Sequence, residues 1–95
     1  MPGALWIAHV TVTDEEAYGR YAAIATEAIA SHGGTFLARG GRYRQMEGTD
    51  RPRNVVARFP SFEDAVACYE SARYQEAVGI AASASTRDLV IVEEA

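Results

Sequence analysis

The chain contains no lysine, only one cysteine and two histidines, and no apolar run as long as the roughly 18 residues of a membrane span. The single Cys68 excludes an intramolecular disulfide, and two separated histidines with one thiol match no zinc-ligand spacing. The phosphate loop of many nucleotide-binding proteins is excluded because it requires a lysine. The start of the chain lacks the basic-then-apolar layout of a signal peptide. We therefore expect a cytoplasmic protein with no metal, no cofactor and no contact with a membrane.

Negative charge exceeds positive charge, since thirteen acidic residues stand against nine arginines and give a net charge of −4. A domain that binds nucleic acid by neutralising phosphates has the opposite sign, so nucleic acid is not expected as a partner. The positive charge gathers in residues 39–58, where the local charge is +4. This segment is suited to attract a small carboxylate or phosphate. The alternative is a solvated strand face that pairs with acidic residues of a neighbouring chain.

The alternation of apolar residues predicts the element order β-α-β-β-α-β within a single domain over residues 1–95. A capping box at Thr13 and Glu16 starts the first helix, and the pair Gly33-Gly34 ends it. Ser61 caps the second helix. The helical pattern is weaker between Tyr74 and Ala82, where the helix is predicted either to continue or to break. Strands are predicted at residues 5–12, 35–39, 43–47, 55–59 and 86–93. The segment 43–47 is expected to pair with 35–39. As an alternative, residues 43–59 form one long interrupted strand.

This order is typical of the split βαβ fold, an α+β architecture in which one four-stranded antiparallel sheet carries both helices on one face. The other face would expose Leu5, Ile7 and Leu37 on a monomer, and an apolar patch of this kind usually marks an interface. We therefore predict a homodimer in which two sheets face each other around a barrel-like core. The alternation places His9 and Arg39 on the same face, where buried polar groups need a partner or a ligand.

Several segments resemble one known family over nearly the whole chain. The most specific are the run Phe36-Leu37-Ala38-Arg39-Gly40-Gly41, the helix entry Phe59-Pro60-Ser61 and the pair Tyr74-Gln75, in this order and at compatible spacings. Together with residues 6–10, 13–18 and 88–93 they are similar to the uncharacterised domain-of-unknown-function family 1330. The resemblance implies a ferredoxin-like fold of the dimeric α+β barrel superfamily, whose other branches include cofactor-free monooxygenases and muconolactone-isomerase-like proteins. It implies no established reaction. Relatives often carry one or two arginines where Ala81 and Ala82 stand.

Two side chains are predicted to be catalytic. His9 carries an imidazole, which gains and loses protons near neutral pH, and inside an enclosed barrel it is suited to act as an acid or a base. Arg39 precedes a Gly-Gly turn, where its planar guanidinium can hold a carboxylate or enolate oxygen. The structural alternatives are a histidine hydrogen-bonded across the dimer and an arginine paired with Glu47 or Asp88.

Four further side chains are predicted to contact a substrate, namely Tyr18, Arg44, Glu47 and Tyr69. The arginine and the carboxylate come from the basic segment, and the tyrosines come from the two helices, where aromatic residues at helical spacing are more often packed in the core. The sequence thus predicts a homodimeric small-molecule-binding protein. The more specific form of this hypothesis is a cofactor-free enzyme of the monooxygenase or isomerase type that acts on a small carboxylate or enolisable compound. The expected ligand is anionic or aromatic.

The alternative function is a non-catalytic dimeric binding or structural module without a pocket. The two hypotheses differ in what they require of the protein interior. A continuous cavity that touches both His9 and Arg39 favours the enzyme. An Arg39 that is locked to an acid, together with a His9 in apolar surroundings, favours the structural module.

Overall fold

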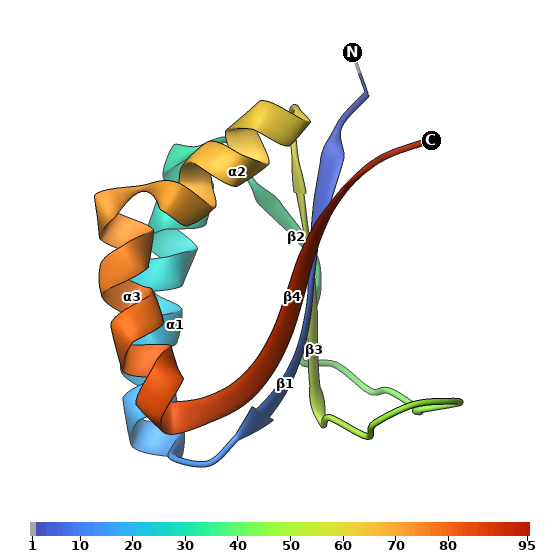
Figure 1. Cartoon of the computed structure of the whole chain (residues 1–95), viewed down its shortest axis with the longest axis vertical. Helices are drawn as coiled ribbons and strands as arrows, with labels where there is room; N and C mark the ends of the chain where they lie inside the picture. Colours follow the sequence, from blue (N-terminus) through green and yellow to red (C-terminus); the bar gives the residue numbers. More distant parts are fainter. Residues whose placement is uncertain (1) are drawn as a thin grey trace.

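The computed structural model describes residues 2–95, which form a four-stranded antiparallel sheet with helices on one of its faces (Figure 1). The spatial order of the strands is β2-β3-β1-β4, and the chain order confirms the predicted βαββαβ arrangement with its second helix divided in two. None of the helices in these residues is long and apolar enough to cross a membrane. The elements are β1 (Ala4–Val12), α1 (Glu15–Ser31), β2 (Thr35–Arg39), β3 (Arg53–Phe59), α2 (Phe62–Glu70), α3 (Ala72–Ala84) and β4 (Ser85–Glu93).

Helix α1 begins after Asp14, whose carboxylate accepts a hydrogen bond of 3.1 Å from the backbone N–H of Ala17. The prediction that Thr13 is the N-cap is therefore wrong by one residue. The backbone N–H groups of Thr13 and Asp14 both donate to the carbonyl of Ala84, so Thr13 belongs to the turn that joins β1 to the helix. At the other end Gly33 adopts a φ of +80°, which glycine reaches without strain, and the predicted stop is confirmed.

Asp14→Ala is expected to lower the free energy of unfolding by about 1 kcal/mol, because it removes the acceptor for an N–H group at the helix start. Urea denaturation followed by circular dichroism measures this loss. The matched control is Thr13→Ala, since the hydroxyl of Thr13 makes no hydrogen bond within residues 2–95. Equal losses in the two variants would show that the cap is shared between the two side chains.

The second helical segment is capped by Ser61, whose hydroxyl oxygen accepts a 3.1 Å hydrogen bond from Asp64 N–H, as predicted. Its division falls at Ser71, which has an extended backbone with ψ of 148°. The Ser71 hydroxyl donates to the carbonyl of Cys68 at the end of α2 and accepts from Tyr74 N–H in the first turn of α3. One serine therefore ends one helix and starts the next.

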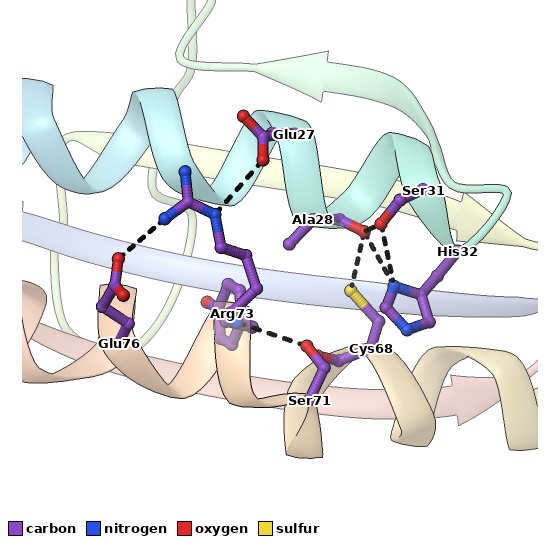
Figure 2. Close-up of polar contacts among 9 residues, drawn as sticks. Glu27, Ala28, Ser31, His32, Cys68, Ser71, Arg73 and Glu76 are labelled. Carbon is purple, nitrogen blue, oxygen red and sulfur yellow. Dashed lines mark hydrogen bonds and ion pairs between the residues drawn. The ribbon is translucent and has the colours of Figure 1, made fainter.

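The junction between α1 and the α2–α3 pair is shown in Figure 2. Arg73 lies between Glu27 of α1 and Glu76 of α3, at 3.2 and 2.7 Å, and these exposed ion pairs add little to stability. Cys68 is fully buried and its thiol donates to the carbonyl of Ala28. Burial raises the pKa of this thiol to about 11, so it stays protonated and packs as a small apolar side chain.

The predicted strand at 43–47 is wrong. Strand β2 pairs with β3 instead, and residues 40–52 form a loop that projects from the sheet on the side away from the helices (Figure 1). The two large apolar residues of the loop, Tyr43 and Met46, are three positions apart, so one face of a strand cannot bury both. Residues 55, 57 and 59, by contrast, place Val, Ala and Phe on one face at a period of two.

A bulge at Leu37 changes the face on which the end of β2 lies. Phe36 pairs with Ala57, Ala38 pairs with Val56 and Arg39 pairs with Val55, so one extra residue stands between the first two pairs. Arg39 therefore shares a face with Phe36. The prediction that Arg39 shares the helix-free face of the sheet with His9 is wrong, because strict alternation does not hold across a bulge.

The core lies between the sheet and the helices, and Trp6 is at its centre. The Trp6 indole donates a 3.0 Å hydrogen bond to the carbonyl of Ala65 in α2. Its ring centroid lies 5.1 Å from that of Phe59 and 4.9 Å from that of Tyr74. Most other core positions on the helices and strands are alanines, so the few aromatic rings supply much of the buried volume.

The opposite face of the sheet is uncovered and apolar over part of its area, as predicted. Ile7 lies across from Val56 on one side and Val90 on the other, and Leu5 pairs with Val92. Val90 is 54% exposed, which is high for a central apolar position of a strand. This surface, formed by Leu5, Ile7, Val56, Val90 and Val92, is called the open face below.

Candidate functional site

His9 lies beyond the apolar part of the open face, where it is exposed and pairs with Asn54 and Asp88 across the strands. Its Nδ1 is 2.6 Å from Asn54 Oδ1. Arg51 completes this polar group, because its Nε donates to Asp88 at 2.9 Å and its carbonyl accepts from Asn54. His9 is thus held on the side of the sheet that carries no helix.

Arg39 lies on the helix side, where its Nη2 donates to the hydroxyl of Thr26 in α1 at 2.8 Å and its guanidinium lies 4.4 Å from the centre of the Phe36 ring. The two residues predicted to act together therefore lie on opposite faces of the sheet. Because the sheet separates them, they cannot act on one ligand within the same chain.

Two of the predicted substrate contacts, Arg44 and Glu47, lie in the exposed loop 40–52. The side chain of Gln45 donates to the carbonyl of Glu47, so the loop is organised by contacts within itself. The two predicted tyrosines lie elsewhere. Tyr18 is buried on α1, and Tyr69 is half-buried on α2, with its ring centre 6.0 Å from that of Trp6. The structure brings Tyr18 and Arg39 together and leaves Arg44 and Glu47 apart from them.

A cavity of about 40 Å³ lies between α1 and the sheet, and Tyr18 and Arg39 both line it. Two further arginines line the same cavity, Arg53 of β3 and Arg87 of β4. Both pair with the fully buried Val10 of β1, so all three side chains stand on the helix side of the sheet. The cavity is named the arginine pocket below. Its remaining wall is mainly apolar, from residues such as Ala22, Ala25, Ile29, Val55 and Leu89.

The arginine pocket depends on a glycine for its shape. Gly40 follows β2 with a φ of +68°, and a Cβ atom at this position would lie 2.6 Å from Nη1 of Arg53. Any other residue would strain the backbone and displace the guanidinium. Gly40, the first residue after Arg39, therefore gives Arg53 room beside the turn.

Positive charge in the arginine pocket is not neutralised by a side chain. Arg53 lies 5.7 Å from the Tyr18 ring centre, and Arg87 lies 4.8 Å from that of Tyr21 and donates to the Tyr74 hydroxyl at 3.3 Å. Among the described residues 2–95, no carboxylate forms an ion pair with the three arginines of the pocket. The arginines that do form ion pairs within residues 2–95 lie elsewhere and are Arg20, Arg51, Arg58 and Arg73.

One donor of Arg53 is buried and has no hydrogen-bond partner among the described residues. The Nε of Arg53 is shielded from solvent and makes no hydrogen bond to any atom of the described chain. A buried N–H group without an acceptor costs roughly 1–3 kcal/mol, and more when the group is charged. Arg53 therefore keeps a buried charge that no side chain of the described residues neutralises.

The phenol groups beside the arginines are donors as well. The hydroxyls of Tyr21 and Tyr74 are 2.6 Å apart and share a hydrogen bond. Burial raises the pKa of Tyr18 and of Tyr74 above the ordinary phenol value, and the neighbouring Tyr21 acts in the same direction. These groups therefore stay protonated near neutral pH. The residues that line the arginine pocket include no carboxylate and no imidazole, so arginines and tyrosines surround a mainly apolar space that has no side-chain base.

Sequence reasoning missed Arg53 and Arg87, although a signal for them exists. Arg53 continues the period-two face of Val55, Ala57 and Phe59, and starting this strand two residues earlier would have included it. Arg87 lies two residues before Leu89 on the same face of β4. Arg53 is the first residue of β3 and lies outside the predicted strand 55–59, because boundaries are the least certain part of a sequence-based assignment. Arg87 lies inside the predicted strand 86–93, and it was missed because its face was not considered.

A second cavity, of about 290 Å³, lies between α3 and β4. It shares Arg87 and Leu89 with the arginine pocket, so these two side chains form the boundary between them. It is named the outer cavity below. Its other lining residues are Tyr69, Val78, Ala81, Ala82 and Ser85.

Residues 3–95 match the family described as "Domain of unknown function (DUF1330)", which confirms the resemblance found in the sequence. No curated protein matches the chain. Among solved structures, a protein of unknown function from Rhodopseudomonas palustris superimposes with a TM-score of 0.79 at 17% identity, over 99% of this chain and 83% of that one.

Two other solved structures extend the comparison. SnoaB from Streptomyces nogalater, described as a cofactor-independent oxygenase, gives a TM-score of 0.69 at 12% identity over 100% of this chain and 95% of its own. A dimeric ferredoxin-like protein of unknown function from Thermobifida fusca gives 0.65 at 16% identity, over 98% of this chain and 92% of its own. At such low identity these likenesses show the fold alone, and they confirm the ferredoxin-like fold.

Proposed function

Since the chain belongs to the DUF1330 family and has the ferredoxin-like fold of dimeric and enzymatic relatives, we propose that it is a homodimer that binds a small organic anion in the arginine pocket. The observation that carries this proposal is the set of three arginines without a carboxylate partner. One of them, Arg53, also has a buried N–H group without an acceptor.

A carboxylate is the anion that fits these donors best. Guanidinium groups bind carboxylates through paired, charge-assisted hydrogen bonds, which are about twice as strong as neutral ones. A cavity of about 40 Å³ has room for an anionic group of this size, since one water needs about 10–15 Å³ by the same measure. The apolar wall strengthens the attraction, because charges interact more strongly where water is excluded.

A cofactor-free enzyme that acts on a small carboxylate or enolisable compound is the second candidate function. It is favoured by the chain of donors from Arg87 through Tyr74 to Tyr21, which can stabilise negative charge on an enolate oxygen. SnoaB, described as a cofactor-independent oxygenase, has the same fold. Because no base lines the pocket, the reactant for such chemistry has to arrive as an anion or lose its proton to solvent. Binding is the part of the proposal that the pocket supports directly.

Among the residues predicted from the sequence, Arg39 and Tyr18 belong to the proposed binding site and Tyr69 lines the outer cavity. His9, Arg44 and Glu47 lie outside the arginine pocket, and we propose no role for them in binding the anion. His9 is instead placed beside the surface that the proposed dimer covers. Neither cavity touches His9, and Arg39 pairs with Thr26 and not with an acid, so neither criterion that separates the enzyme from the non-catalytic module is met, and both stay predictions.

Arg53→Gln tests the proposed function. This change is expected to weaken binding of benzoate at least tenfold, because a hydrogen bond to a charged group contributes about 1.5–3 kcal/mol. Isothermal titration calorimetry on the whole protein measures the dissociation constant. Arg20→Gln is the matched control, since Arg20 is exposed on α1 and pairs only with Glu16. The proposal is wrong if the wild-type protein shows no saturable binding of benzoate, or if the two variants bind it equally.

A further inference from the structure

The outer cavity exists because α3 and β4 separate from a shared corner. The chain passes from Ala84 of α3 to Ser85 of β4 without a linker, and the two elements then diverge (Figure 1). The α3 residues that line the space are Val78, Ala81 and Ala82, whose short side chains leave about 290 Å³ of it open. Ligand pockets have volumes from about 300 Å³ upward, so the cavity has room for one small molecule.

The lining of the outer cavity is rich in polar groups for its size. Three of its seven residues carry a polar side-chain group, namely Tyr69, Ser85 and Arg87. The Tyr69 hydroxyl makes no hydrogen bond within residues 2–95, since the contact of this residue with Gln75 uses the backbone carbonyl. The Ser85 hydroxyl donates to the carbonyl of Ala81 at 2.7 Å and keeps the lone pairs of its oxygen. The lining therefore offers one hydroxyl that donates and accepts and one oxygen that accepts.

Arg87 gives the outer cavity its only charge. The lining residues include no carboxylate, and Arg87 forms no ion pair with the acidic side chains of the described residues. A guanidinium has five N–H donors, and the 3.3 Å hydrogen bond to the Tyr74 hydroxyl uses one of them. A ligand with one negative charge balances this arginine. A cation, or a second negative charge, would find no partner among the lining side chains.

We infer that the outer cavity is a second binding site, which takes a small hydroxylated monoanion of the sugar-acid or hydroxy-acid class. Its carboxylate pairs with Arg87, and its hydroxyl groups exchange hydrogen bonds with Tyr69 and Ser85. A hydrocarbon chain in the same place would take water from these two hydroxyls and give them no partner, which costs free energy. The inference goes beyond the proposed function, and it requires no passage between the outer cavity and the arginine pocket.

The two sites can be told apart although Arg87 lines both of them. Arg53 lines only the arginine pocket, and Ala82 lines only the outer cavity. A substitution at either position therefore changes the wall of one site and leaves the wall of the other intact.

Ala82→Glu tests the inference, because it adds a negative charge to the wall of the outer cavity, where it repels an anion bound at Arg87. We expect at least a tenfold loss of affinity for D-gluconate, measured by isothermal titration calorimetry with the whole protein. The matched control is Ser83→Glu, which adds the same charge at an exposed neighbour on α3 that does not line the cavity. It should bind D-gluconate like the wild type.

Circular dichroism verifies that both glutamate variants fold. If Ala82→Glu does not, Tyr69→Phe takes its place, because it keeps the ring beside Trp6 and removes only the hydroxyl. This variant should bind D-gluconate at least threefold more weakly than the wild type. Hexanoate has the same carbon chain as D-gluconate and no hydroxyls, and it should bind the wild type at least tenfold more weakly. Equal binding of the two anions would overturn the assignment to a hydroxylated ligand.

The remaining outcomes separate this inference from the proposed function, which is tested with benzoate. Arg53→Gln should bind D-gluconate nearly as well as the wild type does. If it loses as much affinity as Ala82→Glu, D-gluconate lies in the arginine pocket and the outer cavity is not its site. If the wild type shows no saturable binding of D-gluconate, or if Ala82→Glu and Ser83→Glu bind it equally, the inference is wrong, and the result with benzoate is unaffected.

Discussion

Ile7→Arg is expected to convert the proposed dimer into a monomer. Ile7 lies at the centre of the open face, between Val56 and Val90 on the neighbouring strands. In the proposed sheet-to-sheet dimer an arginine at this position would be buried against hydrocarbon with no acid beside it, which costs several kcal/mol per chain. By the two-fold symmetry of such a dimer each variant chain contributes one such charge, so the cost is doubled.

Sedimentation velocity of the wild-type protein and the variant at the same concentration measures this change. Ala23→Arg is the matched control, because it adds the same charge at an exposed position of α1 on the opposite side of the molecule and should leave the dimer intact. A wild-type protein that sediments as a monomer, or an Ile7→Arg variant that remains a dimer, would show that the open face is not the interface.

The loop 40–52 supports the choice of this face. It projects on the side of the sheet that the helices leave uncovered (Figure 1), and it carries Met46, which is 76% exposed, and Tyr43, which is 40% exposed. Its contacts are largely within itself, such as the hydrogen bond from the Tyr43 hydroxyl to Asp50. In the proposed dimer the loop extends beside the second copy, where these apolar groups gain a surface to pack on.

Much of the fold was predictable because it follows from local rules. The alternation of β1 places Trp6, Ala8 and Val10 toward the helices and Ile7 on the open face, and the structure confirms both assignments. Ser61 and Gly33 set helix boundaries through their own side chain or backbone, and these were predicted correctly. Each of these features depends on residues that are neighbours in the chain.

The candidate site was less predictable because it depends on register. The extra residue at Leu37 turns Arg39 to the helix side, and nothing in the run from Thr35 to Arg39 marks that position as a bulge. Arg53 and Arg87 line the same cavity only because each pairs with Val10, from opposite sides of β1. Pairing between strands that are distant in sequence cannot be derived from the period of either strand alone.

The largest expected effect on stability comes from Trp6→Ala, which should lower the free energy of unfolding by about 3–5 kcal/mol. The indole is 4% exposed and fills the space where α2, α3 and β3 meet, against the rings of Phe59 and Tyr74. Because most other positions of the buried core are alanines, few side chains there are long enough to close the resulting void. Small domains are stable by only about 5–15 kcal/mol, so this variant is expected to approach the limit of folding.

Urea denaturation must be followed by circular dichroism here, since Trp6 is the only tryptophan and its fluorescence is lost in the variant. Trp6→Phe separates the two contributions of the indole. It keeps an aromatic ring in the void but removes the donor to the carbonyl of Ala65, so it should cost less than half as much as alanine. Val90→Ala is the control for the loss of an apolar group from an exposed position. A loss below about 1 kcal/mol in Trp6→Ala would mean that the alanine-rich core relaxes around the missing ring, and the aromatic cluster would then not be what holds the helices on the sheet.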